Sequence, residues 1–93
     1  MRLRYTDTAR DDIDLAIAWY ERQRTGLGIE FLNCIEQAID SIASHPKAYA
    51  VRYRSFRACV VKRFPFSIYF TLEDDALIVH SVFHHRRDPD DRP

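Results

Sequence analysis

The stretch FLNCIEQAIDSIASHP, residues 31–46, decides the fold of this 93-residue chain. Its apolar side chains recur three or four residues apart, which is the spacing of one helix face. The residues on this face are Phe31, Leu32, Ile35, Ala38, Ile39 and Ile42. The pair His45-Pro46 ends the run, because the residue before a proline disfavours helical geometry. The stretch therefore predicts an amphipathic helix.

The preceding segment predicts a second helix of the same kind. Its helix-spaced apolar residues are Ile13, Ala16, Ile17 and Tyr20, and the helix should run to about Gln23. We expect Thr8 to cap its start. Leu15 and Trp19 widen its apolar stripe, and we expect Trp19 to pack in the core. The glycine-bearing break at residues 25–28 then makes the two helices an antiparallel hairpin.

From Tyr49 onward the apolar pattern changes to that of β-strands. The expected strands are Val51 to Arg54, Phe56 to Phe64, Ser67 to Leu72 and Ala76 to His84. Pro65 and the acidic run at residues 73–75 supply turns. With a short edge strand at Arg2 to Tyr5, this order predicts one α+β domain over residues 1–93. The helical hairpin covers one face of a three- to four-stranded antiparallel sheet.

Two helices can cover only one face of such a sheet, yet the strands are apolar at both parities. Ala58 and Val60 alternate with Cys59 and Val61, and the last strand shows the same pattern. A monomer rarely exposes a large apolar patch, so we expect a partner that packs on the second face or pairs with an edge strand. The alternative is that a curled sheet and long arginine stems hide this face.

Composition restricts the class of protein. Hydrophobic residues make up 46% of the chain, without a run of about 18 apolar residues that would span a membrane. The N-terminus also lacks the pattern of a signal peptide, so we expect a cytoplasmic protein. Cys34 and Cys59 fall within apolar patterns and are expected to be buried thiols rather than a disulfide.

The formal net charge of zero conceals a strong asymmetry. Residues 1–46 carry a net charge of −3, residues 47–72 carry +6 without any acid, and residues 73–93 carry −3. An acid-free basic block is typical of a surface for nucleic acid or for an acidic protein segment. A solvated strand surface balanced by acidic flanks is the alternative.

Several short motifs along the chain resemble those of ParE-type toxins, in the RelE/ParE superfamily. They are Tyr5 and Ala9, Ala18-Trp19-Tyr20-Glu21, Gly26-Leu27-Gly28, Phe31-Leu32, Pro46, Arg57, the run RFPFSIYF at residues 63–70 and the run VFHHRRDP at residues 82–89. Each motif is weak alone, but together they cover nearly the whole chain in the order of the family.

The resemblance implies the toxin of a type II toxin–antitoxin pair. A cognate antitoxin would wrap and neutralise it, in an assembly that can be a toxin–antitoxin heterotetramer. Free toxin would stop growth either by inhibiting DNA gyrase, as in the ParE branch, or by cleaving mRNA on the ribosome, as in the RelE branch.

The nuclease branch needs a general base, fixed cations and a general acid close together. Its members resemble one another in an arginine early in the penultimate strand and a tyrosine near the C-terminus. This chain has Ser67 at the strand position and lacks a tyrosine after Tyr69. Arg57 and Arg63 would lie about 20 Å apart along a strand, too far to hold one phosphate. We therefore expect a non-enzymatic gyrase inhibitor, with a ribosome-dependent mRNA endonuclease as the alternative.

Candidate site residues follow from the basic block and the C-terminal motif. The expected binding residues are Arg54, Arg57, Lys62, Arg63, Arg86 and Arg87. A nuclease would instead use His84, Arg57 and Arg63, with His84, or alternatively His85, moving the proton. His80 and His84 are about 13 Å apart along a strand, and His84 and His85 point to opposite faces, so we expect neither a metal site nor a cofactor.

Overall fold

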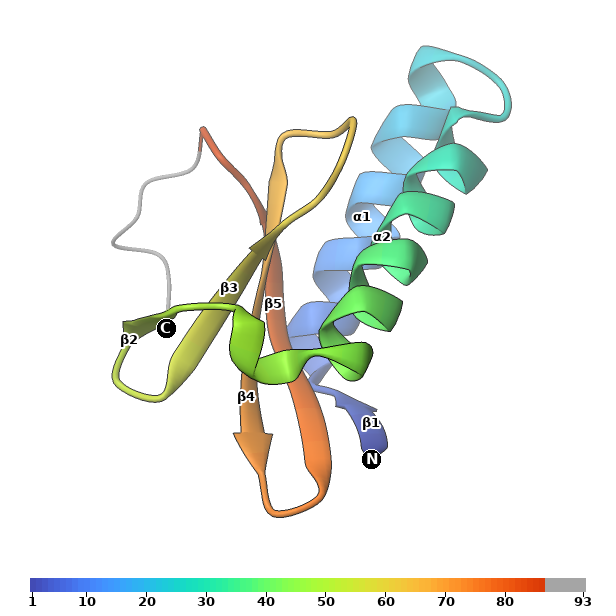
Figure 1. The fold of residues 1–93 in the computed structure, drawn as a ribbon. Coiled ribbons are helices and arrows are strands. Elements are labelled where there is room, and N and C mark those ends of the chain that lie inside the picture. The colour runs from blue at the N-terminus through green and yellow to red at the C-terminus, as the bar shows by residue number, and fades with distance from the viewer. Residues whose placement is uncertain (87–93) are drawn as a thin grey trace.

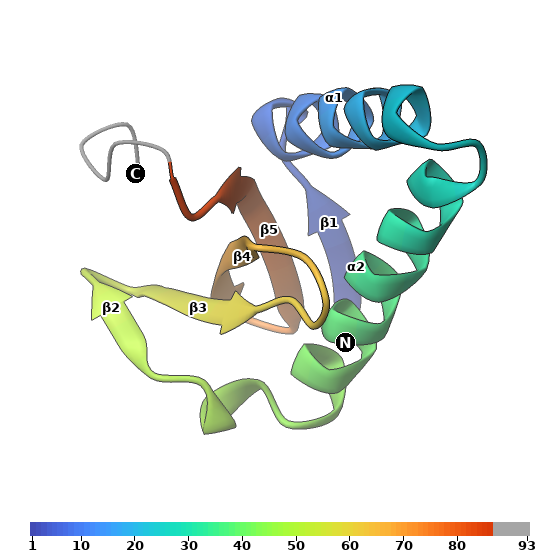
Figure 2. The same cartoon turned by 90° about the horizontal axis from the view of Figure 1, so that it is seen from above.

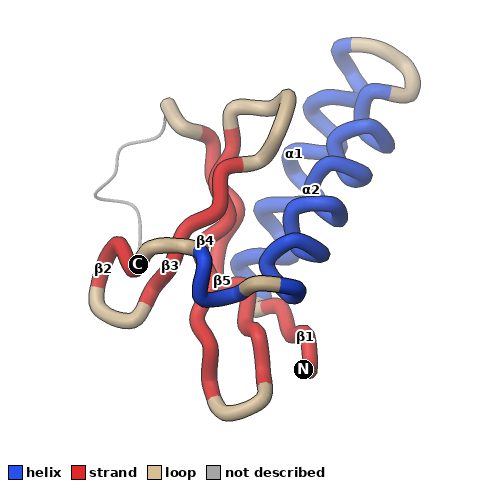
Figure 3. The backbone as a smooth tube through the Cα atoms, in the orientation of Figure 1, coloured by secondary structure: helices blue, strands red, loops and turns tan. Residues whose placement is uncertain are grey.

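The structure, a computed structural model, describes residues 1–86 and has two layers, two helices packed against a sheet (Figure 1). In chain order its elements are β1 (Arg2–Tyr5), α1 (Asp7–Gln23), α2 (Leu27–Ser44), a short 3-10 helix (Pro46–Ala48), β2 (Val51–Tyr53), β3 (Phe56–Val60), β4 (Phe66–Glu73) and β5 (Ala76–His84). The α+β class and the helical hairpin are as the sequence predicts. Figure 3 shows the helices on one side of the strands.

The sheet has five strands in the order β1-β5-β4-β3-β2, rather than the three or four expected. Strands β2 to β5 are antiparallel to their neighbours, but β1 pairs with β5 in parallel. The backbone N–H of Thr6 extends this pairing by donating to the carbonyl of Val79 at 3.0 Å. The parallel pair arises because the whole hairpin and three strands lie between β1 and β5, and no turn signal in the sequence links them.

Helix α1 begins at Asp7 because Thr6 caps it, so the expected cap at Thr8 is wrong. The Thr6 hydroxyl oxygen accepts a hydrogen bond from the N–H of Ala9 at 3.1 Å and donates to the carbonyl of His80 at 2.9 Å. One side chain thereby caps the helix and ties its start to β5. The tertiary contact to β5 favours Thr6 over Thr8, and local sequence does not reveal it.

The two helices approach closely at the start of α2. Gly26 has a left-handed backbone, with φ 91°, which turns the chain between the helices. At Gly28 a Cβ atom would lie 2.9 Å from the carbonyl oxygen of Ile17, so only glycine allows this contact between α1 and α2. Figure 2 shows the two helices joined by this short turn and diverging from it.

An aromatic cluster forms the core between the hairpin and the sheet. Phe31 is fully buried, and its ring lies 5.3 Å from Tyr20, 5.2 Å from Phe64 and 5.0 Å from Phe66. The buried apolar face of α2 is the one that the sequence predicts, with Phe31, Cys34, Ile35, Ile39 and Ile42. Cys34 and Cys59 are buried free thiols, as expected.

The sheet face that points away from the helices is largely buried on β4 and β5, in line with the alternative of a curled sheet, whereas Val60 on β3 is 65% exposed. Ser67, Thr71, Ser81 and Phe83 on this face are each at most 9% exposed. The rings of Phe56 and His80 lie 4.8 Å apart although β4 runs between their strands, and flat strands two apart would be separated by about 9.6 Å. The sheet therefore curls toward this face and covers itself.

Candidate functional site

Ser67 occupies the start of β4, the position where nuclease members of the superfamily resemble one another in an arginine. Its hydroxyl lies 2.9 Å from Nε2 of His85. The backbone N–H of His85 donates to the carbonyl of Pro65 at 2.8 Å and holds the ring beside this hydroxyl. Opposite Ser67 on the neighbouring strands lie Val60 and Phe83. The position thus offers a hydroxyl and an imidazole among apolar neighbours, without a fixed cation at either paired position.

His84 and His85 point to opposite faces, as the sequence predicts. The His84 ring packs against the ring of Phe66 at 5.2 Å, and its Nδ1 accepts the N–H of Arg86 at 3.0 Å. His84 therefore lies on the helix side of the sheet, away from Ser67. The imidazole beside the position of the nuclease arginine belongs to His85, the alternative to His84.

A third histidine, His80, belongs to a polar cluster on the sheet face that points away from the helices. Nε2 of His80 lies 2.8 Å from the Thr71 hydroxyl, which in turn donates to Glu73 at 3.1 Å. Burial lowers the pKa of His80 below its ordinary value, with the Glu73 carboxylate acting in the opposite direction. This histidine belongs to the packing of the sheet.

An apolar groove opens on the flank of α1, between this helix and the turn that joins β3 to β4. Its volume is about 610 Å³, and it is lined by Asp12, Leu15, Ala16, Trp19, Tyr20, Arg22, Pro65, Phe66, His84 and Arg86. Leu15 is 67% exposed and Trp19 is 51% exposed. The expected core position of Trp19 is therefore wrong, because the sheet does not extend under this flank of the helix.

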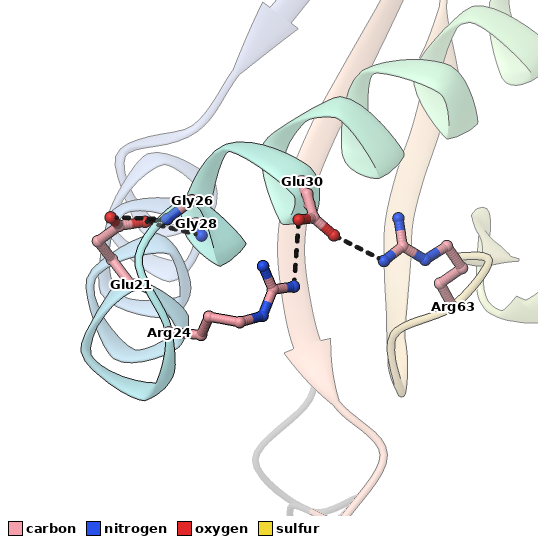
Figure 4. Close-up of polar contacts among 6 residues, drawn as sticks. All are labelled: Glu21, Arg24, Gly26, Gly28, Glu30 and Arg63. Carbon is pink, nitrogen blue, oxygen red and sulfur yellow. Dashed lines mark hydrogen bonds and ion pairs between the residues drawn. The ribbon is translucent and has the colours of Figure 1, made fainter.

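Arg63 lies in the turn after β3 and is paired with a carboxylate from α2. Strand β3 ends at Val60, not at Phe64 as expected, and Arg63 adopts a left-handed backbone with φ 74°. Its guanidinium donates to Glu30 at 2.8 Å, and Arg24 donates to the other oxygen of Glu30 at 3.1 Å (Figure 4). The two arginines hold the pKa of Glu30 below its usual value.

A second carboxylate, that of Glu21, stabilises the turn between α1 and α2. Glu21 of α1 accepts hydrogen bonds from the backbone N–H groups of Gly26 and Gly28, at 3.0 to 3.1 Å (Figure 4). These N–H groups belong to the first turn of α2, which has unsatisfied donors and a positive dipole. The hydrogen bonds lower the pKa of Glu21. Residues 21–30 and Arg63 thus form a closed electrostatic network.

The remaining cations of the basic block lie in one part of the sheet. We call residues 47–62 the basic arm; they contain β2, β3 and their turn, and no acid. Arg57 of β3 donates a hydrogen bond to the carbonyl of Tyr49 at 2.7 Å and so links β3 to the segment before β2. Arg54 adopts a left-handed backbone in the turn, with φ 52°, and its guanidinium lies over the Tyr53 ring, 5.3 Å from the centroid.

The expected binding residues therefore do not form one site. Arg54 and Lys62 are exposed on the basic arm, Arg57 is braced within it, Arg63 joins the network around Glu30, and Arg86 lies at the groove. Arg87 lies outside the described residues. The nuclease set of His84, Arg57 and Arg63 is likewise dispersed over separate contacts.

The sequence pattern of a known family matches residues 3–89, and the family is described as the ParE toxin of the type II toxin–antitoxin system, parDE. The chain belongs to the ParE toxin family. This match confirms the resemblance that the motifs indicate. Among curated proteins, none matches the sequence.

Two solved structures share the fold of this ParE family member. The structure titled as the chromosomal ParDE toxin–antitoxin system from P. aeruginosa aligns with a TM-score of 0.78 at 18% identity, over 90% of this chain and 95% of that one. The intact E. coli RelBE toxin–antitoxin complex aligns with a TM-score of 0.68 at 13% identity, over 92% and 98%. At these identities the likeness concerns the fold, which both branches of the superfamily share.

Sequence reasoning missed three features of this ParE family protein. The Ser67–His85 contact joins residues 18 positions apart, and only the strand register brings them together. Glu30 had no visible role, since its partners come from a turn on each side of α2. The exposed stripe of Leu15 and Trp19 did carry a signal, because it widens the apolar face of α1 beyond what one core contact needs.

Proposed function

We propose that this ParE family protein arrests growth by binding DNA gyrase, without catalysing a reaction of its own, and that a cognate antitoxin neutralises it. Within residues 1–86, neither helix has the length and apolarity of a membrane span. The alternative, mRNA cleavage on the ribosome, would require a site that stabilises a pentacoordinate phosphate.

The environment of Ser67 is the observation that carries the non-enzymatic proposal. A phosphoryl-transfer site needs cations fixed around the reacting phosphate. Here the position of the nuclease arginine carries a serine whose paired residues are Val60 and Phe83. The nearest arginine of the basic block along the chain, Arg63, is paired with Glu30. This arrangement supports a protein that acts through its surface.

The groove beside α1 is the proposed site of the antitoxin. Leu15 and Trp19 present large exposed apolar side chains there, and Pro65 and Phe66 form the opposite wall. Apolar anchors surrounded by charged groups are typical of grooves that accept an amphipathic helix. Arg22 and Arg86 favour an antitoxin segment with acidic residues beside its apolar face.

The proposed function is tested by assaying purified toxin for gyrase supercoiling and for mRNA cleavage on translating ribosomes. We expect loss of supercoiling, intact mRNA, and full reversal by the antitoxin. The variants Ser67→Ala and His85→Gln should keep this inhibition, because no proton has to move. Cleavage of mRNA that either variant abolishes would instead establish a nuclease built on the Ser67–His85 pair, since a general acid or base contributes about 10²–10⁴-fold to rate.

Antitoxin binding in the groove is tested with the variant Trp19→Ala. A central aromatic anchor contributes about 2 kcal/mol or more to binding, so affinity should fall at least about 30-fold. Tyr53→Ala is the matched control, because Tyr53 is 50% exposed against 51% for Trp19 but lies on the basic arm. Equal losses in the two variants, measured by calorimetry, would place the antitoxin elsewhere.

A further inference from the structure

The basic arm forms a two-stranded ribbon at the edge of the sheet opposite β1. It projects to the side away from α1 (Figure 2). The strands β2 and β3 are antiparallel, and the left-handed Arg54 makes the turn between them. Val51 and Tyr53 are about half exposed, and Val60 is 65% exposed. Strand β3 is paired with β4 from Arg57 to Val60, so the part of the ribbon that is free of β4 is its tip, residues 51–56.

Exposed cations on the basic arm have no ion pair and no acid in their own segment of the chain. Arg4, Arg10 and Arg22 also form no ion pair within residues 1–86, but they lie in a segment that contains eight acids. Lys47, Arg52, Arg54 and Lys62 are exposed and form no ion pair with any carboxylate of residues 1–86. By contrast, Arg2, Arg24 and Arg63 are each paired with Asp75 or Glu30. Arg52 and Arg54 lie on the ribbon, Lys47 lies in the 3-10 helix before it and Lys62 follows β3. Four positive charges without an ion pair among residues 1–86 create a local field that attracts a polyanion.

The shape of the ribbon distinguishes between polyanions. An acidic peptide that added a strand would need a long regular edge, but β2 has three residues and its register with β3 shifts between Val51 and Tyr53. A two-stranded ribbon fits the major groove of B-form DNA, which is about 12 Å wide. The major groove of A-form RNA is too narrow to admit it.

We propose that the basic arm binds duplex DNA, with the ribbon in or along the major groove and Lys47, Arg52, Arg54 and Lys62 on phosphates. This goes beyond the proposed function, because it assigns the toxin a DNA contact that does not depend on gyrase. If the proposed function also holds, the toxin engages the gyrase–DNA complex through both the protein and its bound duplex.

The test is the affinity of the purified chain for a fluorescent 20-base-pair duplex, measured by anisotropy at several salt concentrations. Each phosphate contact contributes about 0.9 to the slope of log affinity against log salt. The variant Arg52→Gln/Arg54→Gln should lower the slope by about 2 and the affinity at least about tenfold near 0.1 M salt. The control Arg4→Gln/Arg10→Gln removes two exposed charges from β1 and α1, and should change both little.

Each other outcome would overturn the proposal. Equal losses in the two double variants would mean that only net charge matters. Preference for single-stranded RNA of the same length would exclude insertion into a duplex groove. Displacement of the duplex by an oligoglutamate peptide at matched charge would identify an acidic protein segment as the partner. Thermal unfolding checks that both double variants are folded.

A gyrase assay separates failure of this proposal from failure of the proposed function. If the chain binds duplex DNA through the arm but leaves supercoiling intact, the DNA contact stands and the gyrase proposal fails. If the chain inhibits gyrase, but Arg52→Gln/Arg54→Gln inhibits equally and DNA binding is absent, the gyrase proposal stands and the DNA contact fails.

Discussion

The two ends of the sheet–hairpin assembly use the same residue types in opposite ways. Around the turn between α1 and α2, Glu21 and Glu30 satisfy two backbone N–H groups and two arginines. On the basic arm, Arg52 and Arg54 have no acidic partner among residues 1–86. Arginine content therefore does not identify an interaction surface. What distinguishes the arm is that its exposed cations are grouped in a segment without any acid and form no ion pair with a carboxylate of residues 1–86.

The contrast also decides which arginines are suitable for a control substitution. Arg24 lies in the turn between the helices, where an arginine on a loop would be expected to have little effect when substituted. In the structure it shares Glu30 with Arg63. Substituting Arg24 by glutamate would remove one of the two arginines that bind Glu30 and place a second carboxylate beside it, so the exposed Arg4 and Arg10 are better controls.

The largest difference between the two ends should appear on truncating an aromatic side chain in each. Phe31→Ala removes a fully buried ring from the cluster under the hairpin, and should lower the free energy of unfolding by about 3–5 kcal/mol. Tyr53→Ala on the arm should change it by less than about 1 kcal/mol, because the side chain is half exposed. Urea denaturation measures both, and comparable losses would mean that the arm is part of the core.

A smaller effect is expected from a single added methyl group at the turn between α1 and α2, which we call the closed end. Gly28→Ala would place a Cβ 2.9 Å from the Ile17 carbonyl, so the helices must separate, at a cost of about 1–3 kcal/mol. Ala48→Ser near the start of the arm, at an exposed position, adds one atom without a comparable clash. A fall in the unfolding midpoint for Gly28→Ala alone would sharpen the comparison, and equal midpoints would show that the helix contact can relax.

Arg57 is the one cation of the arm with a structural hydrogen bond, so it should behave unlike Arg52. Arg57→Gln loses the charged donor that holds the Tyr49 carbonyl at 2.7 Å, and should cost about 1–2 kcal/mol of stability. Arg52→Gln should leave stability unchanged within about 0.5 kcal/mol. If both variants unfold at the same urea concentration, the hydrogen bond from Arg57 to Tyr49 contributes nothing to stability, and Arg57 is then equivalent to Arg52.

The smallest expected effect is a pH dependence confined to the closed end. The pKa of Glu30 is lowered by its hydrogen bonds to Arg63 and Arg24, and that of Glu21 by the N–H groups of Gly26 and Gly28. A lowered folded-state pKa contributes stability above the unfolded-state pKa, about 4.3, and loses it as pH falls through the folded value.

The thermal midpoint of Glu30→Gln should therefore lie below that of the parent at pH 7 and converge with it toward pH 3. Arg52→Gln is the control, because its side chain faces no carboxylate of residues 1–86 and its difference from the parent should not follow this titration. A difference for Glu30→Gln that stays constant down to pH 3 would show that its charge is not the cause.

Much of the fold was predictable because periodicity reports burial directly. The face of α2 with Phe31, Ile35 and Ile42 and the edge strand at Arg2–Tyr5 are where the sequence places them. The errors occur where a distant contact decides. Thr6 rather than Thr8 caps α1 because it also reaches the carbonyl of His80. The same reason explains why the candidate site was only partly predictable, since the surroundings of Ser67 depend on strand register.

By itself the sequence determined the family, the α+β class and the acid-free charge block, because these depend on residue order and composition alone. Only the tertiary structure decided which cations are neutralised, which side of α1 is open and which histidine stands beside Ser67. Ion pairs such as Arg63–Glu30 join residues 33 positions apart. Whether a charged side chain has an oppositely charged partner is therefore decided only when the chain folds. The physical reason is that electrostatic and packing interactions depend on distance in space, which the spacing of residues along a strand or helix does not specify beyond a few turns.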